Sequence, residues 1–235
     1  DQFKVDPDFF CRNELVTYNR NHWLASMGIY VFSRKALISL LEPKSFLDFG
    51  KDVIPYAVNS KDFKVSSYLY GGYWEDIGTL KSFFNSNLAL TQTRPSFKDY
   101  DDLRPVYSQK HPLPGSKFLN SHLSNALISD GCILDNVMIE RSILGPRTTI
   151  QPGTKISNTY IMGNEFYEGT KDYSPKIGHS CRINNAIIDK NVCIGNHVKL
   201  VNKDNLTEYD SPDIYIREGI IVVMKGAQIP DGFEL

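Results

Sequence analysis

The sequence has no excess of charge of either sign and no long apolar run. Its 235 residues include 26 basic and 27 acidic side chains, which gives a net charge of −1. A nucleic-acid-binding domain usually carries a basic excess, so that class of protein is not expected. No apolar stretch approaches the roughly 20 residues that a membrane-spanning helix needs, and the first residues lack the pattern of a secretory signal. We therefore expect a globular protein with neither nucleic acid nor a membrane as its partner.

Cysteines are also few, and their spacing matches no zinc-binding pattern. Two of the four, Cys132 and Cys193, lie inside regularly spaced apolar stretches. Free cysteine behaves as a small, readily buried apolar residue. The sequence therefore predicts core thiols in a reducing compartment rather than a metal centre or a disulfide framework.

Strand-like and helix-like segments alternate through the first 91 residues. Residues 26–33 and 64–70 have the composition or alternation of strands. Residues 34–41, 49–58 and 79–90 have apolar side chains at helical spacing. Such an alternation predicts an α/β layer structure for residues 1–91.

Residues 92–116 have a different composition. Four prolines and a glycine disfavour a helix there, namely Pro95, Pro105, Pro112, Pro114 and Gly115. We interpret this segment as an ordered linker between residues 1–91 and a second domain, residues 117–235.

A period of six residues marks the second domain. Seven apolar residues follow at this spacing: Ala126, Cys132, Met138, Leu144, Ile150, Ile156 and Met162. After an interruption at 163–176 the same phase returns at Ala186, Val192 and Val198, with Ile188, Ile194 and Leu200 two residues behind. Neither a helix nor a simple strand has a period of six, whereas a parallel β-helix does. The pattern predicts such a rod, with these residues pointing inward.

Several segments together resemble those of ADP-glucose pyrophosphorylases (glucose-1-phosphate adenylyltransferases), most closely the plant and cyanobacterial type. The segments are ASMGIYVF (25–32), DFG (48–50), YWEDIGT (73–79), AIIDKN (186–191) and NKDN (202–205). The resemblance implies a Rossmann-like nucleotidyltransferase domain followed by a left-handed parallel β-helix, assembled as a homo- or hetero-tetramer. It implies synthesis of ADP-glucose and pyrophosphate from ATP and glucose-1-phosphate, in the bacterial cytoplasm or the plastid, without secretion.

The same resemblance implies that the chain is a fragment. Residues 1–91 resemble the C-terminal part of the catalytic domain. The Gly-rich loop for the ATP phosphates, the Glu-Lys-Pro segment for the sugar phosphate and the first metal-binding Asp belong upstream in the family. We therefore expect no turnover by this chain alone.

Asp76 is the leading candidate for catalysis and metal binding. It matches the Asp of the family's Trp-Glu-Asp-Ile-Gly motif, which the resemblance implies binds Mg²⁺. Mg²⁺ is usually held by one or two carboxylates together with substrate phosphates. The alternative for Asp76 is a carboxylate that stabilises the start of the following helix.

Three further residues match the family's glucose-1-phosphate site: Ser26, Tyr30 and Asp48. Each has a plainer alternative. Ser26 could be an ordinary residue at a strand end, Tyr30 a core aromatic and Asp48 the N-cap of the helix that follows.

Four residues match the family's site for the activator 3-phosphoglycerate and its opponent, phosphate. They are Gln109, His111, Lys190 and Lys225. The family usually has arginine at the position of His111, and a histidine is largely neutral at pH 7 and lacks the guanidinium fork. This departure predicts weaker effector binding. The alternative for each lysine is an ordinary solvated surface residue.

Two other functions remain open. The chain could belong to a regulatory subunit of the same hetero-oligomer, with the family fold and little catalysis. It could also be a hexapeptide-repeat acyltransferase, although the segment before the rod and Trp74-Glu75-Asp76 argue against this class.

Overall fold

The structure is a computed structural model that describes residues 25–42, 46–98, 100–107, 112–167 and 174–235. Gln109 and His111 lie outside the described residues. The chain divides into two compact units between Trp74 and Glu75, and each is described by itself.

The described residues of the first unit hold three helical segments, α2 (Arg34–Leu41), the π-helical turn η1 (Phe49–Val53) and α3 (Ile54–Asn59). Ser33 caps α2, since its side chain accepts a hydrogen bond from the backbone N–H of Ala36. The predicted helices at 34–41 and 49–58 are thus confirmed. Their buried residues are Leu40, Val53 and Ala57, against which Phe32, Phe46 and Phe63 pack.

The strands predicted at 26–33 and 64–70 are wrong for this structure, because no strand forms among the described residues before β1. Val31 is 97% exposed and Tyr68 is 87% exposed. A strand needs a neighbour for its backbone hydrogen bonds, and the described part of this unit supplies none. Both segments are rich in residues that favour strands, but no neighbouring strand pairs with them among the described residues.

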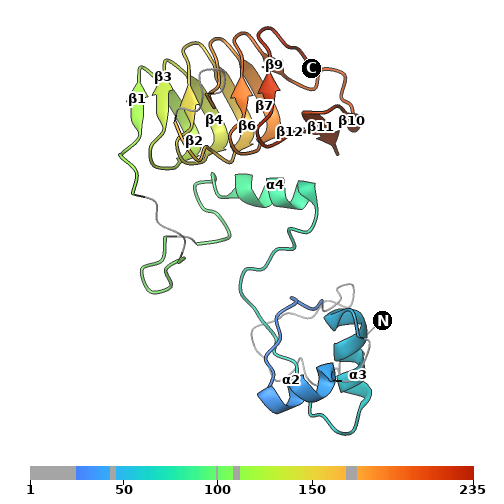
Figure 1. Ribbon diagram of the computed structural model, residues 1–235. Helices are drawn as coiled ribbons and strands as arrows, with labels where there is room; N and C mark the ends of the chain where they lie inside the picture. Colours follow the sequence, from blue (N-terminus) through green and yellow to red (C-terminus); the bar gives the residue numbers. More distant parts are fainter. Residues whose placement is uncertain (1–24, 43–45, 99, 108–111, 168–173) are drawn as a thin grey trace. The chain divides into compact units, whose positions relative to one another are not determined.

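The second unit begins with α4 (Leu80–Ala89), which confirms the helix predicted at 79–90. Thr79 and Ser82 form a reciprocal capping box at its start. Phe84 and Leu88 of α4 are buried against Ile187 and Ile220 of the rod. The helix therefore packs on the rod (Figure 1), although the sequence assigns it to the preceding domain. The boundaries at 91 and 117 stay a prediction.

The packing of α4 leads to a test. Replacing Phe84 with alanine should weaken its attachment by about 3–5 kcal/mol, because a large, fully buried ring is lost. Amide hydrogen exchange in residues 80–89 should accelerate strongly, while exchange in the rod strands changes little. Lys81→Ala, on the exposed side of α4, is the matched control. Unchanged exchange in α4 of the Phe84 variant would contradict this packing.

The described residues between 117 and 235 form the predicted parallel β-helix (Figure 1), in which successive coils place strands side by side. One face is built by short parallel strands: β1 (Lys117–Leu119), β3 (Ile133–Asp135), β5 (Thr149–Ile150), β8 (Cys193–Ile194) and β13 (Gln228–Ile229). Single bridges through Ile177 join β5 to β8. This sheet runs along the whole rod.

The other two faces share longer strands that bend at a corner. They are β2 (His122–Ile128), β4 (Met138–Leu144), β6 (Lys155–Ile161) and β7 (Arg182–Ile188), all in parallel register. Each has a residue with positive φ at the bend: Asn125, Arg141, Asn158 and Asn185. Asparagine tolerates this left-handed conformation better than most residues, which explains its recurrence at three of the four bends.

Four more strands complete the end of the rod. β9 (Lys199–Leu200) and β12 (Ile220–Val223) both pair in parallel with β7. β11 (Ile214–Arg217) then pairs antiparallel with β12, and β10 (Glu208–Asp210) antiparallel with β11. The segment between β9 and β12 is therefore an insertion into the last coil.

The core of the rod confirms most of the six-residue phase. Cys132, Leu144, Ile150 and Ile156 are at most 2% exposed. Ala186, Val192 and Val198 are also buried, as is the second row, Ile188, Ile194 and Leu200. Cys132 and Cys181 are buried, which raises the pKa of both thiols. The predicted core position is confirmed for Cys132, whereas Cys193 is only partly buried.

The phase is wrong at Met138, which is 50% exposed. Its neighbours Val137 and Ile139 are buried instead. The reason lies in the coil length. Met138 pairs with His122 of the preceding coil and with Lys155 of the following coil, and both sequence separations fall short of three hexads. A strict period of six therefore drifts out of register at the corners.

None of the helices in the described residues is long and apolar enough to cross a membrane.

Candidate substrate and effector sites

In the first unit the chain brings together Ser26, Tyr30 and the start of η1. The Ser26 and Tyr30 hydroxyl oxygens lie 3.0 Å apart, and the backbone N–H of Gly28 donates to Ser26 Oγ at 3.2 Å. The Tyr30 ring stacks on Phe49 with an interplanar angle of 17°. Two hydroxyl groups thus sit at a short turn of exposed chain, where either can donate to a sugar or phosphate oxygen.

Asp48 lies next to Phe49 and caps η1. Its Oδ1 accepts a hydrogen bond from the backbone N–H of Lys51 at 2.7 Å. Asp48 therefore acts as an N-cap in this structure, which is the plainer of its two predicted roles. Asp52, which accepts from the backbone N–H groups of Leu47 and Asp48, fixes the same turn, and these bonds hold the pKa of its carboxyl below the usual value.

Asp76 lies in the exposed segment before α4. Its Oδ1 accepts from the backbone N–H of Gly78 at 2.8 Å, which closes a local turn. Thr79, not Asp76, caps α4. No group of three or more His, Cys, Asp or Glu side chains gathers at metal-binding distance within the described parts of the chain. One exposed carboxylate fits a single ligand of a Mg²⁺ ion whose other ligands are phosphates and residues elsewhere.

The structure brings Lys190 and Lys225 together at one corner of the rod. Lys190 follows β7 and Lys225 follows β12, which are adjacent parallel strands. The backbone N–H of Gly226 donates to the carbonyl of Lys190 at 3.0 Å. Two lysines that lie far apart in the sequence thereby project from neighbouring coils at the same corner.

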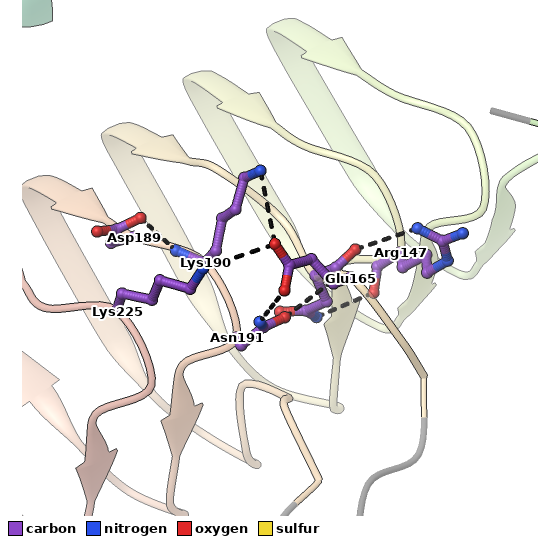
Figure 2. Close-up of polar contacts among 7 residues, drawn as sticks. Arg147, Glu165, Asp189, Lys190, Asn191 and Lys225 are labelled. Atoms are coloured by element: carbon purple, nitrogen blue, oxygen red, sulfur yellow. Dashed lines mark hydrogen bonds and ion pairs between the residues drawn. The ribbon is translucent and has the colours of Figure 1, made fainter. Parts of the chain in front are cut away.

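A carboxylate lies between the two ammonium groups. Glu165 Oε1 is 3.9 Å from Lys190 Nζ and 3.6 Å from Lys225 Nζ, as Figure 2 shows. Hydrogen bonding from the Asn191 side chain, with the charges of Lys225 and Lys190, holds the pKa of Glu165 below its usual value. Glu165 is therefore ionised at neutral pH, and the corner keeps a net positive charge.

Neighbouring residues brace this corner. The backbone N–H of Glu165 donates to Asn191 Oδ1 at 2.8 Å, and Asn191 Nδ2 donates to Glu165 Oε2 at 2.9 Å. Arg147, at the same corner of an earlier coil, donates from Nη1 to the carbonyl of Asn164 at 3.3 Å. Its guanidinium lies 5.9 Å from the centre of the Tyr167 ring. We name this group the lysine corner: Arg147, Glu165, Lys190, Asn191 and Lys225.

Sequence reasoning missed Glu165, Asn191 and Arg147 at this corner. Asn191 could have been noticed in the sequence, because it directly follows Lys190 and asparagine is a residue that favours tight bends with a positive φ. The structure gives it such a φ. Glu165 belongs to the interruption of the period at 163–176, where no pattern fixes a position. Its place beside the lysines follows only from the path of the chain.

Two comparisons with known families bear on these sites. Residues 111–233 match the model of the GLGC left-handed parallel beta-helix domain, and residues 17–93 match that of nucleotidyl transferase. The fold is a nucleotidyltransferase domain followed by a left-handed β-helix, as predicted. These two domains are the domain pair of glucose-1-phosphate adenylyltransferase, and the chain belongs to that family.

Proposed function

We propose that this chain is the C-terminal portion of an enzyme that makes ADP-glucose and pyrophosphate from ATP and glucose-1-phosphate in glycogen or starch synthesis. The order of the two matched domains supports this proposal. We extend the proposal to the plant and cyanobacterial type and to a tetrameric assembly, which the resemblance of the segments around Asp76 and Lys190 supports. The nucleotidyl transferase match favours this function over an acyltransferase.

The proposed catalytic roles follow the chemistry of each side chain. Asp76 would supply one carboxylate to Mg²⁺, which neutralises phosphate charge during nucleotidyl transfer. The Gly78 N–H takes one acceptor site of Oδ1, and the remaining acceptor sites of the carboxylate would be open to the metal. Ser26 and Tyr30 would both hydrogen-bond to glucose-1-phosphate, one as donor and the other as acceptor, because one of their two hydroxyl protons is shared between them. Asp48 would hold the adjacent turn in place.

The proposed regulatory site is the lysine corner. The observation that carries it is the convergence of Lys190 and Lys225 on one point, 3.9 and 3.6 Å from a single carboxylate oxygen. Two ammonium groups aimed at one carboxylate can also bind a carboxylate or phosphate of an effector such as 3-phosphoglycerate. Gln109 and His111 are proposed to contribute to the same site.

A double substitution tests the regulatory role. In an enzyme that contains this chain, Lys190→Gln with Lys225→Gln should raise the 3-phosphoglycerate concentration needed for half-maximal activation by about 10-fold or more, since two charge-assisted contacts are lost. Activity without effector should change little. Lys203→Gln, at another exposed lysine of the rod, is the control. An unchanged activation curve in the double variant would place the effector elsewhere.

A further inference from the structure

The two lysines of the proposed effector site already have an anion between them. Both ammonium groups face Glu165 Oε1, and Figure 2 shows Lys190 and Lys225 approaching it from different coils. A carboxylate offers the same acceptor oxygens and the same sign of charge as an anionic effector. In chemical terms Glu165 stands where such a ligand would bind.

The Glu165 carboxylate is held by Asn191 as well as by the two lysines. Asn191, which is only 6% exposed, binds Glu165 through both its side-chain oxygen and its side-chain nitrogen. The backbone N–H of Asn191 donates in turn to the carbonyl of Gly163 at 3.2 Å. Asn191 therefore fixes the backbone of Glu165, whereas it holds the carboxylate through one hydrogen bond, to Oε2, so the carboxylate can leave the lysines without movement of the backbone.

The contacts between Glu165 and the lysines are loose. Their distances exceed those of a hydrogen bond, and all three side chains are about half exposed. By contrast, Lys199 Nζ lies 2.6 Å from Glu234 Oε1 near the end of the rod. Exposed ion pairs of the looser kind contribute little to stability, so an incoming anion can replace this one at small cost.

We infer that Glu165 is an internal competitor that occupies the two lysines in the free protein and must be displaced by an anionic effector. This inference rests on the proposed function of the lysine corner. Glu165 thereby sets the effector concentration at which the site fills. Because the competition takes place in the free protein, it weakens every anion by the same factor, whatever the charge of that anion.

The test measures anion binding to the full chain directly, by NMR titration of the lysine side-chain signals at pH 8. Glu165→Gln should tighten binding of sulfate and of 3-phosphoglycerate by the same factor, about 2- to 10-fold, as expected for removal of a weak internal ion pair. Glutamine keeps an oxygen for Asn191 and loses only the charge. Glu140→Gln, an exposed glutamate of β4, is the control for net charge.

The outcomes separate the two claims. Lower affinity in Glu165→Gln would show that Glu165 orients the lysines, and a larger gain for 3-phosphoglycerate than for sulfate would show a nearby charge that is not displaced; either result overturns the competitor. An unchanged affinity overturns it as well. If Lys190→Gln and Lys225→Gln leave anion binding intact, the effector site itself is misplaced, which is a failure of the proposed function instead.

Discussion

Replacing Asp76 with asparagine should reduce pyrophosphate release by on the order of 100-fold or more in an enzyme that contains this chain, because a carboxylate ligand of the metal is lost. Asparagine keeps the side-chain oxygen that accepts from the Gly78 N–H, so the local turn should survive. The loss would then report on metal binding rather than on folding. The Mg²⁺ concentration needed for half-maximal rate should rise together with the loss of rate.

Two controls accompany this substitution. Glu75→Gln removes the adjacent exposed carboxylate, to which no metal role is assigned, and should leave the rate within about 3-fold, as expected for a surface substitution. Asp76→Ala removes both the charge and the turn. A normal rate and normal Mg²⁺ dependence in Asp76→Asn, with a loss only in Asp76→Ala, would assign Asp76 to the turn alone.

The second large effect concerns the stability of the rod. Gly145→Ala should lower the free energy of unfolding by about 3 kcal/mol or more, as a severe case of overpacking. A Cβ atom at Gly145 would lie 2.3 Å from the carbonyl oxygen of Met162 in the next coil. The coils cannot separate locally without losing a hydrogen bond, because the Gly145 N–H donates to the carbonyl of Ile161 at 2.7 Å.

Urea denaturation of the chain, followed by circular dichroism, measures this loss as a shift of the unfolding midpoint. Gly115→Ala is a matched control, since a Cβ atom there meets nothing within 4 Å. It should leave the midpoint nearly unchanged. Equal midpoints for Gly145→Ala and the control would contradict the close approach of the coils at this corner.

The sequence predicts the rod well because its signal is local and repeated. Each coil repeats the same inward positions, so Ile150 and Ile156 are found without knowledge of the tertiary structure. Met138 is wrongly predicted to point inward, because the corners make a coil shorter than three hexads. The strand-like segments at 26–33 and 64–70 fail for a different reason: strand formation depends on a neighbouring strand that no pattern within the segment can supply.

Some residues of the candidate sites could be found from the sequence and others could not. Periodicity alone would place the position stacked on Lys190 one ordinary coil later, yet Lys225 lies much further along the chain because β10 and β11 are inserted in that coil. The pairing of these lysines therefore came from resemblance and not from spacing. Glu165 could not be predicted from the period, since it lies where the six-residue repeat is interrupted.

The most direct test of the whole account is pyrophosphate release by an enzyme that contains this chain, given Mg²⁺, ATP and glucose-1-phosphate, with and without 3-phosphoglycerate. We expect release that requires both substrates, rises with 3-phosphoglycerate and falls with phosphate. Mixing with a catalytic partner subunit would restore activity if this chain belongs to a regulatory subunit. No release under either condition would contradict the proposed adenylyltransferase function.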